Sequence, residues 1–450
     1  TLYGARGDEI AVALAHHFGE AGLPDRAAAW FFAAGEQAQR SLAPDEALAH
    51  YEAALGMLRQ APASEARDRR EMSIQLMVGE TRIRLVAPGY AEAYKRALEL
   101  APAVGTPEQL FQASFGSFAA AYYAGDRSRA QTMAWTALSA ARSLGDPGTL
   151  QLGLAWAAVE AKARGARTDA ERYLQEAISL PESRACVPMW DNGGRAFAQS
   201  VLGSTRWECG FPDQAARLTA AAVDRAREMG NPILLQIMLL RDILIRVWGG
   251  DIRGARPRCD EVLQSMKEVN LGGNGPPIMA CAGWCEVLYG RTGRGLEILE
   301  SALQQYEAAG TRVFSTYMWA LYARALGIAG RMGDGLRRVE REIADRLEDE
   351  TGWAAETWRH LGELRMAVPR PDENAAEAAF RTSIDIAREQ ETPSWELLAT
   401  TSLARLLKKQ RRAQEAREML GAIYGWFTEG FDWPYLRDAR QLLAELDGEG

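Results

Sequence analysis

The chain has 450 residues, a formal net charge of −8 at pH 7 and an isoelectric point near 5.4. This acidic balance argues against a nucleic-acid partner, because phosphate binding needs clustered basic charge. The sequence has no run of 18 apolar residues and no apolar signal core at its start. We therefore expect no membrane contact and a cytoplasmic location.

The first residues are apolar without forming a signal sequence. Leu2, Tyr3, Ile10, Val12 and Leu14 lie close together, and the first residue is not methionine. We expect an upstream domain of a longer polypeptide to cover this apolar start.

From residue 125 onward, a glycine-bearing turn returns about every 40 residues. The spacings are 40, 45, 40, 43 and 40 residues. The turns are predicted at Gly125-Asp126, Gly165-Ala166, Gly210-Phe211, Gly250-Asp251, Gly293-Arg294 and Gly333-Asp334. Breaks near Pro369 and Lys408 continue the period. Such a period predicts a solenoid, in which each unit buries its apolar face by stacking on its neighbours.

Within each period the apolar residues follow helical spacing, and we find no alternation that would need a β-strand. After the first turn they recur in steps of three and four residues, at Ala130, Ala134, Ala137, Leu138 and Ala141. Three helices are expected to end in one pattern, with Gly145, Gly230 or Glu391 two residues before a proline. Glycine at this position supplies a left-handed closing residue, and proline stops the helix.

Aromatic residues recur late in the first helix of several units, at Tyr122, Tyr123, Trp207, Trp248, Tyr289 and Tyr322. The interpretation we favour is that these rings fill the wedge between the two helices of a unit. The alternative is that some of them line a ligand groove.

Two stretches rich in turn-forming residues interrupt the period, at 191–194 and 270–277. They are expected to be longer connections between units, and the alternative is that they are functional loops.

Motifs for catalysis, cofactors or metals are absent. The sequence contains neither a phosphate-binding Gly-x-x-x-x-Gly-Lys-Ser/Thr loop nor a His-Glu-x-x-His pair. Cys281 and Cys285 are one helical turn apart and Cys259 precedes them, but no fourth zinc ligand is evident. We interpret them as buried, inert thiols, and the odd count of five cysteines argues against a disulfide framework. We therefore expect no catalytic residues, no cofactor and no metal.

The last helix is predicted from about residue 434 to 446. As the end of a solenoid it needs a polar outer face, because no further unit covers it. Its inward side chains are predicted to be Leu436, Leu442, Leu443 and Leu446, and its solvent-facing ones Arg437, Asp438, Arg440 and Glu445.

The two ends of the chain resemble a known family. Residues 13–22 (ALAHHFGEAG) and 45–55 (DEALAHYEAAL) are similar to the start of a tetratricopeptide-like region in large bacterial signalling ATPases. Residues 379–390 (AFRTSIDIAREQ) and 424–432 (YGWFTEGFD) resemble its end. In that family the region follows the ATPase module, and many members carry a class III adenylate or guanylate cyclase, a kinase or a helix-turn-helix domain. Residues 433–435 (WPY) depart from the family pattern.

Together these features predict an all-α, tetratricopeptide-like solenoid of about 20 helices, wound as a right-handed superhelix. Residues 1–104 are expected to form N-terminal repeats that follow an upstream domain, and residues 105–450 a continuous array with a C-terminal cap. The resemblance implies a regulatory repeat domain and transfers no catalytic residue.

We expect a non-catalytic interaction domain that binds a partner protein, a peptide or its own upstream ATPase or cyclase. The alternative is a small-molecule sensor within the superhelix. An enzyme is the least favoured class, because the motifs are missing. The groove is predicted on the first helix of each unit, and its candidate residues are Arg206, Trp207, Arg241, Arg246, Trp284, Tyr317 and Tyr322.

Overall fold

The computed structural model describes all residues except 1–6, 42, 86, 188–191, 267–274, 309, 311, 347–350 and 449–450. Over the described residues it contains 22 α-helices, one short 3-10 helix and no β-strand. The predicted all-α solenoid class is therefore confirmed. None of the described helices is long and apolar enough to cross a membrane.

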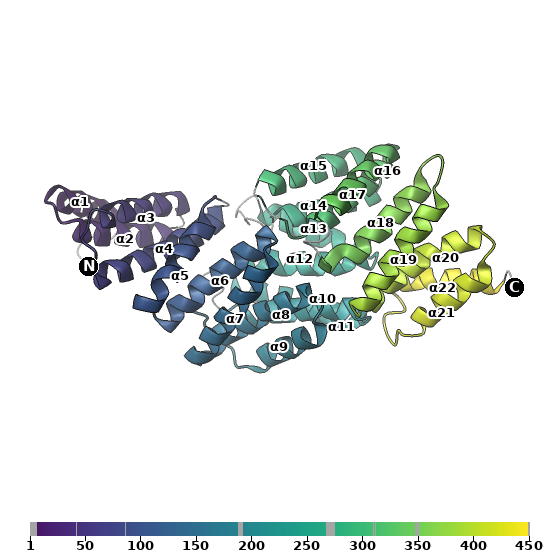
Figure 1. Cartoon of the computed structure of the whole chain (residues 1–450), viewed down its shortest axis with the longest axis horizontal. Coiled ribbons are helices and arrows are strands. Elements are labelled where there is room, and N and C mark those ends of the chain that lie inside the picture. Colours follow the sequence, from purple (N-terminus) through teal and green to yellow (C-terminus); the bar gives the residue numbers. More distant parts are fainter. Residues whose placement is uncertain are drawn as a thin grey trace. The chain divides into compact units, whose positions relative to one another are not determined.

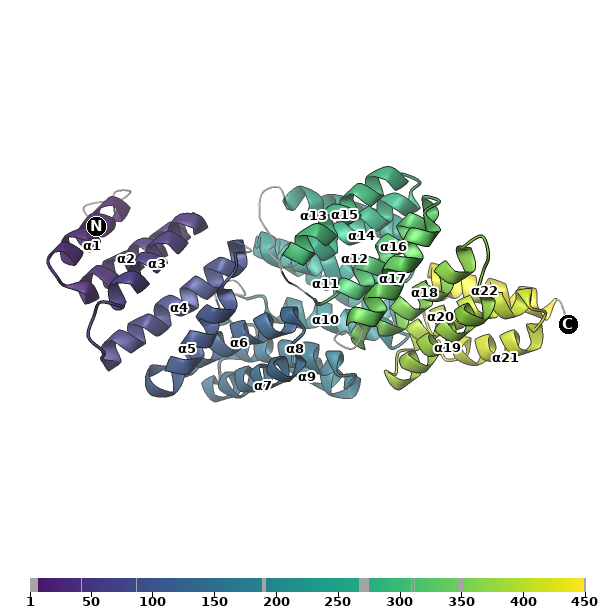
Figure 2. The same cartoon turned by 45° about the horizontal axis from the view of Figure 1, so that its top comes forward.

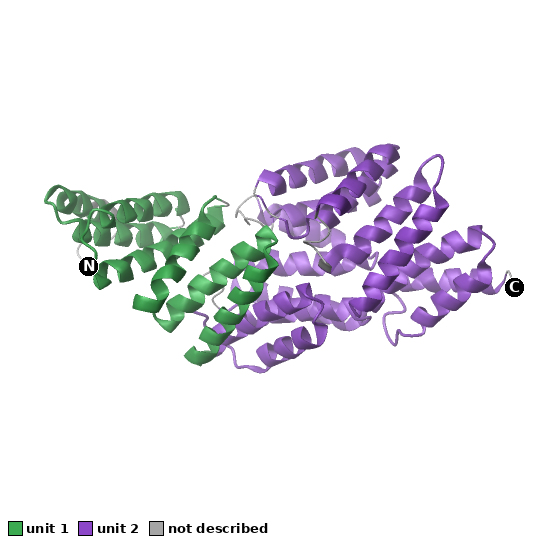
Figure 3. Ribbon diagram, viewed as in Figure 1, with its two compact units in different colours: residues 1–146, 270–273 green, residues 147–269, 274–450 purple. Residues whose placement is uncertain are grey.

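The chain divides into two compact units (Figure 3). Among the described residues, unit 1 extends to Asp146 and unit 2 begins at Pro147. The domain boundary predicted at residue 104 lies within unit 1, between its fifth and sixth helices, and stays a prediction.

Unit 1 contains seven helices (Figure 1). They are α1 (Gly7–Glu20), α2 (Pro24–Arg40), α3 (Pro44–Leu58), α4 (Glu65–Leu85), α5 (Tyr90–Val104), α6 (Pro107–Ala124) and α7 (Arg127–Leu144). Ile10, Val12 and Leu14 of α1 are half-buried. Leu2 and Tyr3 lie outside the described residues.

Unit 2 contains the remaining helices. They are α8 (Pro147–Ala163), α9 (Arg167–Ser179), α10 (Gly194–Glu208), α11 (Pro212–Met229), α12 (Pro232–Trp248), α13 (Ile252–Ser265), α14 (Gly275–Leu288), α15 (Thr292–Ala308), α16 (Ser315–Ile328), α17 (Met332–Arg346), η5 (Thr351–Trp353), α18 (Ala354–Ala367), α19 (Glu373–Glu389), α20 (Pro393–Lys409), α21 (Ala413–Tyr424) and α22 (Pro434–Asp447).

The helices of unit 2 form consecutive pairs, such as α14 with α15 and α16 with α17 (Figure 2). The first helix of each pair also contacts the first helix of the next pair. We call this series, α8, α10, α12, α14, α16, α18 and α20, the first-helix row. Residues 40 or more positions apart in sequence are thereby brought onto one side of unit 2.

Glycines with positive φ make the turns within the pairs. Gly125, Gly165, Gly210 and Gly250 take this conformation, with φ between 76° and 89°. These four predicted turns are confirmed.

The turns predicted at Gly293 and Gly333 are wrong by three residues. Gly290 and Gly330, both with φ of 81°, make these turns, whereas Gly293 and Gly333 lie inside α15 and α17. Gly250, Gly290 and Gly330 are each 40 residues apart, so the period is more regular than predicted.

A small residue follows each turn glycine by five positions and explains the close packing of each pair. In unit 2 the position holds Ala170, Ala215, Ala255, Gly295 and Gly335, all buried. A Cβ added at Gly335 would lie 2.3 Å from the backbone oxygen of Ala323. Only a small side chain lets the second helix approach the first so closely.

The predicted helix-closing positions are confirmed. Gly145 and Gly230 have φ of 70° and 64°, and Glu391, which stands in the same pattern, has φ of 54°. A side chain in this left-handed region is strained, because its Cβ crowds the backbone.

We expect Glu391→Gly to stabilise the protein by about 1 kcal/mol, since Glu391 is exposed and glycine adopts this conformation freely. Urea unfolding measures the change. The control is Asp385→Gly, at an exposed position inside α19, which should lose about 0.3 kcal/mol, because glycine is a weaker helix former than aspartate. A loss of stability in Glu391→Gly would contradict the prediction.

The C-terminal helix has the predicted polar outer face. Leu436, Leu442 and Leu446 are buried, and Leu443 is half-buried. The four predicted outward side chains are exposed: Arg437, Asp438, Arg440 and Glu445.

The connection predicted at residues 270–277 is wrong for its last three residues. Gly275, Pro276 and Pro277 form the first turn of α14, where a missing proline N–H costs no hydrogen bond. The remainder of this stretch, and Asp191, lie outside the described residues.

Candidate functional site

All seven candidate groove residues lie on four neighbouring members of the first-helix row. Arg206 and Trp207 are on α10, Arg241 and Arg246 on α12, Trp284 on α14, and Tyr317 and Tyr322 on α16. Their environments divide them into buried rings, a buried ion-pair network and partly exposed side chains.

Trp207 belongs to a buried aromatic cluster that joins distant parts of unit 2. Its ring centroid lies 5.2 Å from Trp248, 4.7 Å from Trp395 and 5.6 Å from Tyr435. Trp248 also contacts Trp353 at 5.1 Å. We call these five residues the aromatic cluster. Tyr317 contacts Trp353 at 5.5 Å, so this candidate lies beside it.

Two of the late-helix aromatic rings, Trp207 and Trp248, do pack, but the predicted wedge between the helices of one unit is wrong for them. They contact α20, α22 and η5, which come more than 100 residues later in the chain. Tyr289 is different, since it is 40% exposed.

Polar contacts reinforce the junction between α10–α12 and the C-terminal helices. The Asp213 carboxylate accepts hydrogen bonds from the backbone N–H of Gly430 and from Nε1 of Trp433, both at 3.0 Å. The Ser394 hydroxyl donates to the backbone oxygen of Trp207 at 2.5 Å. In an open solenoid each helix pair contacts only the neighbouring pairs. In unit 2, by contrast, helices α10–α12 also contact the C-terminal helices, and we call this the closure of unit 2.

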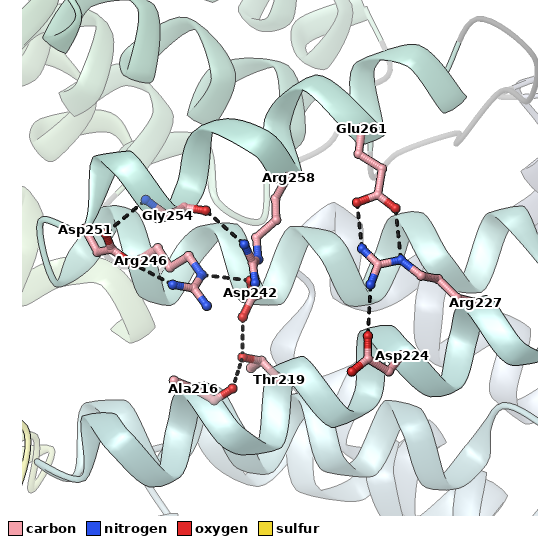
Figure 4. Close-up of polar contacts among 10 residues, drawn as sticks. All are labelled: Ala216, Thr219, Asp224, Arg227, Asp242, Arg246, Asp251, Gly254, Arg258 and Glu261. Carbon is pink, nitrogen blue, oxygen red and sulfur yellow. Dashed lines mark hydrogen bonds and ion pairs between the residues drawn. The ribbon is translucent and has the colours of Figure 1, made fainter.

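Arg246 is part of a buried ion-pair network between α11, α12 and α13 (Figure 4). Its guanidinium donates to Asp242 at 2.9 Å and to Asp251 at 2.7 Å. Asp242 is fully buried and also accepts from the Thr219 hydroxyl at 2.6 Å and pairs with Arg258. These contacts give Arg246 a structural task, the neutralisation of a buried carboxylate.

The remaining arginines and Tyr322 are less deeply placed. Arg206, 23% exposed, pairs with Glu171 of the preceding pair. Arg241 is half-buried. The Tyr322 hydroxyl donates to Glu300 at 2.5 Å, and its ring is half-buried. Trp284 is buried, with the Arg324 guanidinium 5.3 Å from its ring centre.

A charge network on α18 was missed by the sequence analysis. Arg359 donates to Glu356 at 2.7 Å and pairs with Glu363, while His360 Nε2 lies 3.0 Å from Glu356. Burial opposes ionisation of Glu363, but the charges of Arg324 and Arg359 outweigh it and lower the pKa of this carboxyl to about 2. The spacing of three and four residues among these charges on one helix face is a signal that could have found the network.

A second missed cluster lies between α8, α9 and α10. Lys162 Nζ donates to the Ser204 hydroxyl and to Glu208, both at 3.1 Å. Arg167 lies 3.5 Å from Glu208. Burial lowers the pKa of Lys162 to about 8 and outweighs the opposite effect of Glu208; Arg167 and Arg241 lower it further. The three cations lie on different helices with no shared motif, so the sequence alone offered no signal.

The cysteines are free thiols. Cys259 and Cys285 Sγ atoms lie 4.0 Å apart in the interior. Burial raises the pKa of Cys281, so this thiol resists forming the reactive thiolate. Within the described parts of the chain, no three His, Cys, Asp or Glu side chains are arranged to hold a metal ion.

No protein-family model matches the sequence. No curated protein is significantly similar to it.

Solved structures with similar folds have low sequence identity. One is a Signal Transduction ATPase with Numerous Domains with a tetratricopeptide repeat sensor, from Pyrococcus horikoshii. It is 14% identical over 84% of this chain, with a TM-score of 0.44, and the chain spans 55% of its length. Human IFIT1 with m7Gppp-AAAA is 14% identical over 93% of this chain and 90% of its own, with a TM-score of 0.47. A Rap protein complexed with Competence and Sporulation Factor is 10% identical over 94% of this chain and 98% of its own, with a TM-score of 0.39.

The expectation that excluded a nucleic-acid partner is wrong. Human IFIT1, a protein of similar fold, is seen with the nucleic-acid ligands PPP-AAAA and m7Gppp-AAAA. Net charge is a sum over the whole chain, whereas binding depends on the charge near the ligand. Neither the acidic balance nor the helical fold therefore excludes such a ligand.

Proposed function

We propose that this chain is a non-catalytic regulatory repeat region of a larger bacterial signalling protein. Its first-helix row in unit 2 binds a partner protein, a peptide or an upstream ATPase or cyclase domain of the same polypeptide. The resemblance of the two ends of the chain to signalling ATPases supports its place in a larger signalling protein.

One observation carries the proposal. Arg206, Arg241 and Tyr322 keep part of their surface exposed while lying on helices of one continuous row. Arginine offers a planar set of donors for carboxylates, and a tyrosine ring offers rigid contact area. A row with both suits an acidic or aromatic-containing segment of a partner.

A small-molecule sensor is the second candidate, favoured by the aromatic cluster beside the charge network on α18. Tyr317 connects the two, with its ring 6.5 Å from that of His360. The rings of the cluster contact one another directly, so a ligand there would have to displace them. The partner-binding role needs no such rearrangement, and we prefer it for that reason.

The test is calorimetric titration of the chain with a separately expressed ATPase or cyclase domain of the proposed signalling protein. The double variant Arg206→Ala with Tyr322→Ala should bind at least about tenfold more weakly, with little change in melting temperature. Arg437→Ala, at an exposed position on α22, is the control and should bind normally. Equal affinity of the double variant and the parent would overturn the proposal.

A further inference from the structure

A segment near the C-terminus covers two of the turns in unit 2. We call residues 426–434, which lead from α21 into α22, the covering segment. A Cβ added at Gly210 would lie 3.2 Å from Nε1 of Trp426, and one added at Gly250 would lie 3.2 Å from Cβ of Pro434. The covering segment has the sequence WFTEGFDWP, with four aromatic rings and two carboxylates. These two turns therefore already accept an acidic, aromatic stretch of chain.

The next two turns are open. Gly290 and Gly330 follow in the same 40-residue steps, but a Cβ added at either would meet nothing within 4 Å from other described parts of the chain. Leu288 and Ile328 precede these glycines by two residues and are 43% and 52% exposed. Trp248, at the equivalent position on α12, is buried in the aromatic cluster. The open turns thus expose apolar side chains at a position that is covered one pair earlier.

One polar contact of the covering segment has a counterpart at the first open turn. Gln214, four residues after Gly210, donates from Nε2 to the Glu429 carboxylate at 3.1 Å and from its backbone N–H at 2.9 Å. The equivalent position after Gly290 holds Arg294, whose side chain is 66% exposed. A guanidinium binds a carboxylate more strongly than an amide does, because its paired donors carry charge.

The charge at this open turn also favours an acidic ligand. Arg291 and Arg294 both pair with Glu286, which is the only carboxylate among the described residues that either of them pairs with. Glu286 is buried and also pairs with Arg256. The guanidinium carbons of Arg256 and Arg291 lie 4.9 Å and 5.8 Å from the ring centre of Tyr289, which is partly exposed. Exposed arginines and an exposed ring therefore lie side by side.

We propose that the open turns bind an acidic, aromatic-containing segment of a partner protein. We call the surface the open turn edge, and it consists of Leu288, Tyr289, Arg291, Arg294 and Ile328. Carboxylates of the segment pair with Arg291 and Arg294, and its rings pack on Leu288 and Ile328. The surface shares no residue with the first-helix candidates tested above, so the inference rests on the proposed function only for the existence of a partner.

The probe is a synthetic peptide with the sequence of residues 426–434, titrated calorimetrically into the full chain. The chain's own covering segment stays in place, because its tether gives it an effective concentration on the order of millimolar. A peptide with Glu429→Gln and Asp432→Asn should bind about tenfold more weakly, since its charge-assisted contacts are lost. Absence of binding by the acidic peptide up to about 1 mM would overturn the proposal.

A double variant assigns the binding to this surface. Leu288→Ser with Arg294→Glu should weaken peptide binding at least about tenfold, with little change in melting temperature because both side chains are exposed. The control, Leu23→Ser with Arg437→Glu, makes the same two changes at exposed positions elsewhere and should bind as the parent does. Unchanged affinity in the first variant, or an equal loss in both, would place the peptide elsewhere and overturn the proposal.

The same double variant distinguishes two other occupants. Sedimentation of the parent reports self-association, and a dimer that the double variant loses would assign the surface to a second copy of the chain. A single-stranded uridine decamer replaces the peptide in a second titration, and tighter binding of the RNA would assign the surface to nucleic acid. Either result would overturn the proposal. No step uses an ATPase or cyclase domain, so failure here is separate from failure of the partner-binding test.

Discussion

Trp207→Ala should destabilise unit 2 by about 3–5 kcal/mol, the range for truncating a large buried aromatic side chain. Trp207 has no exposed surface, and its ring lies within 6 Å of three other rings. Urea unfolding followed by tryptophan fluorescence measures the loss. Trp426→Ala, which removes a 58% exposed ring from the same unit, should cost far less.

The same variant tests the closure of unit 2. Because Trp207 contacts Trp395 of α20, its loss should increase amide hydrogen exchange along α20, where Ser394, 187 residues from Trp207, also bonds to it. Helices α14 and α15 form a separate pair and should change less. Unchanged protection of the α20 amides from exchange would mean that each helix pair is stabilised only by the neighbouring pairs, as in an open solenoid.

The helical repeat could be predicted from sequence because its causes are local. Turn glycines, helix-closing residues and small residues at fixed positions each act within one pair of helices. The two misplaced turns show the limit of reading single residues: Gly290 and Gly293 are both plausible there. The 40-residue step from Gly250 selects Gly290, so periodicity was the better guide.

The closure of unit 2 could not be predicted in the same way. Trp207 and Trp395, or Asp213 and Trp433, are about 200 residues apart, and no period relates them. Isolated tryptophans at repeat spacing are therefore correctly interpreted as packing residues, but their partners are not visible in the sequence.

The candidate groove shows the same division. That the first helices present the candidates follows from the repeat, whereas the burial of each arginine depends on the fold. Arg246 neutralises Asp242, which has no exposed surface, while Arg206 and Arg241 stay partly exposed. Asp242 lies four residues before Arg246 on the same helix, a spacing that the sequence shows, but the burial of this pair between α11 and α13 is not visible there.

A buried carboxyl in unit 1 predicts a second large effect, on the pH dependence of stability. Glu80 of α4 is 6% exposed and lies near Tyr51, Tyr94 and Arg84. Burial raises its pKa to about 7, and the charge of Arg84 only partly opposes this shift. The folded protein therefore holds a proton on Glu80 that the unfolded chain, with a pKa near 4.5, releases earlier.

The sign follows from this difference in proton binding. Below pH 4.5 the neutral carboxyl has its full stabilising effect, and the effect is lost as pH rises through 7. The difference between the unfolded pKa of 4.5 and the folded pKa of about 7 corresponds to about 3 kcal/mol of unfolding free energy. Glu80→Gln, which is always neutral, should thus be up to ~3 kcal/mol more stable than the parent above pH 7 and similar to it near pH 4.5.

Hydrogen exchange of α4 and α5, compared between variant and parent at each pH, measures this gain directly in unit 1. The exposed Glu46→Gln on α3 is the matched control and should show no pH-dependent gain. The expected effect comes from the burial of Glu80, and the attraction between Glu80 and Arg84 opposes it only in part. A constant difference between Glu80→Gln and the parent from pH 5 to pH 8 would show that Glu80 does not titrate in this range and would contradict the prediction.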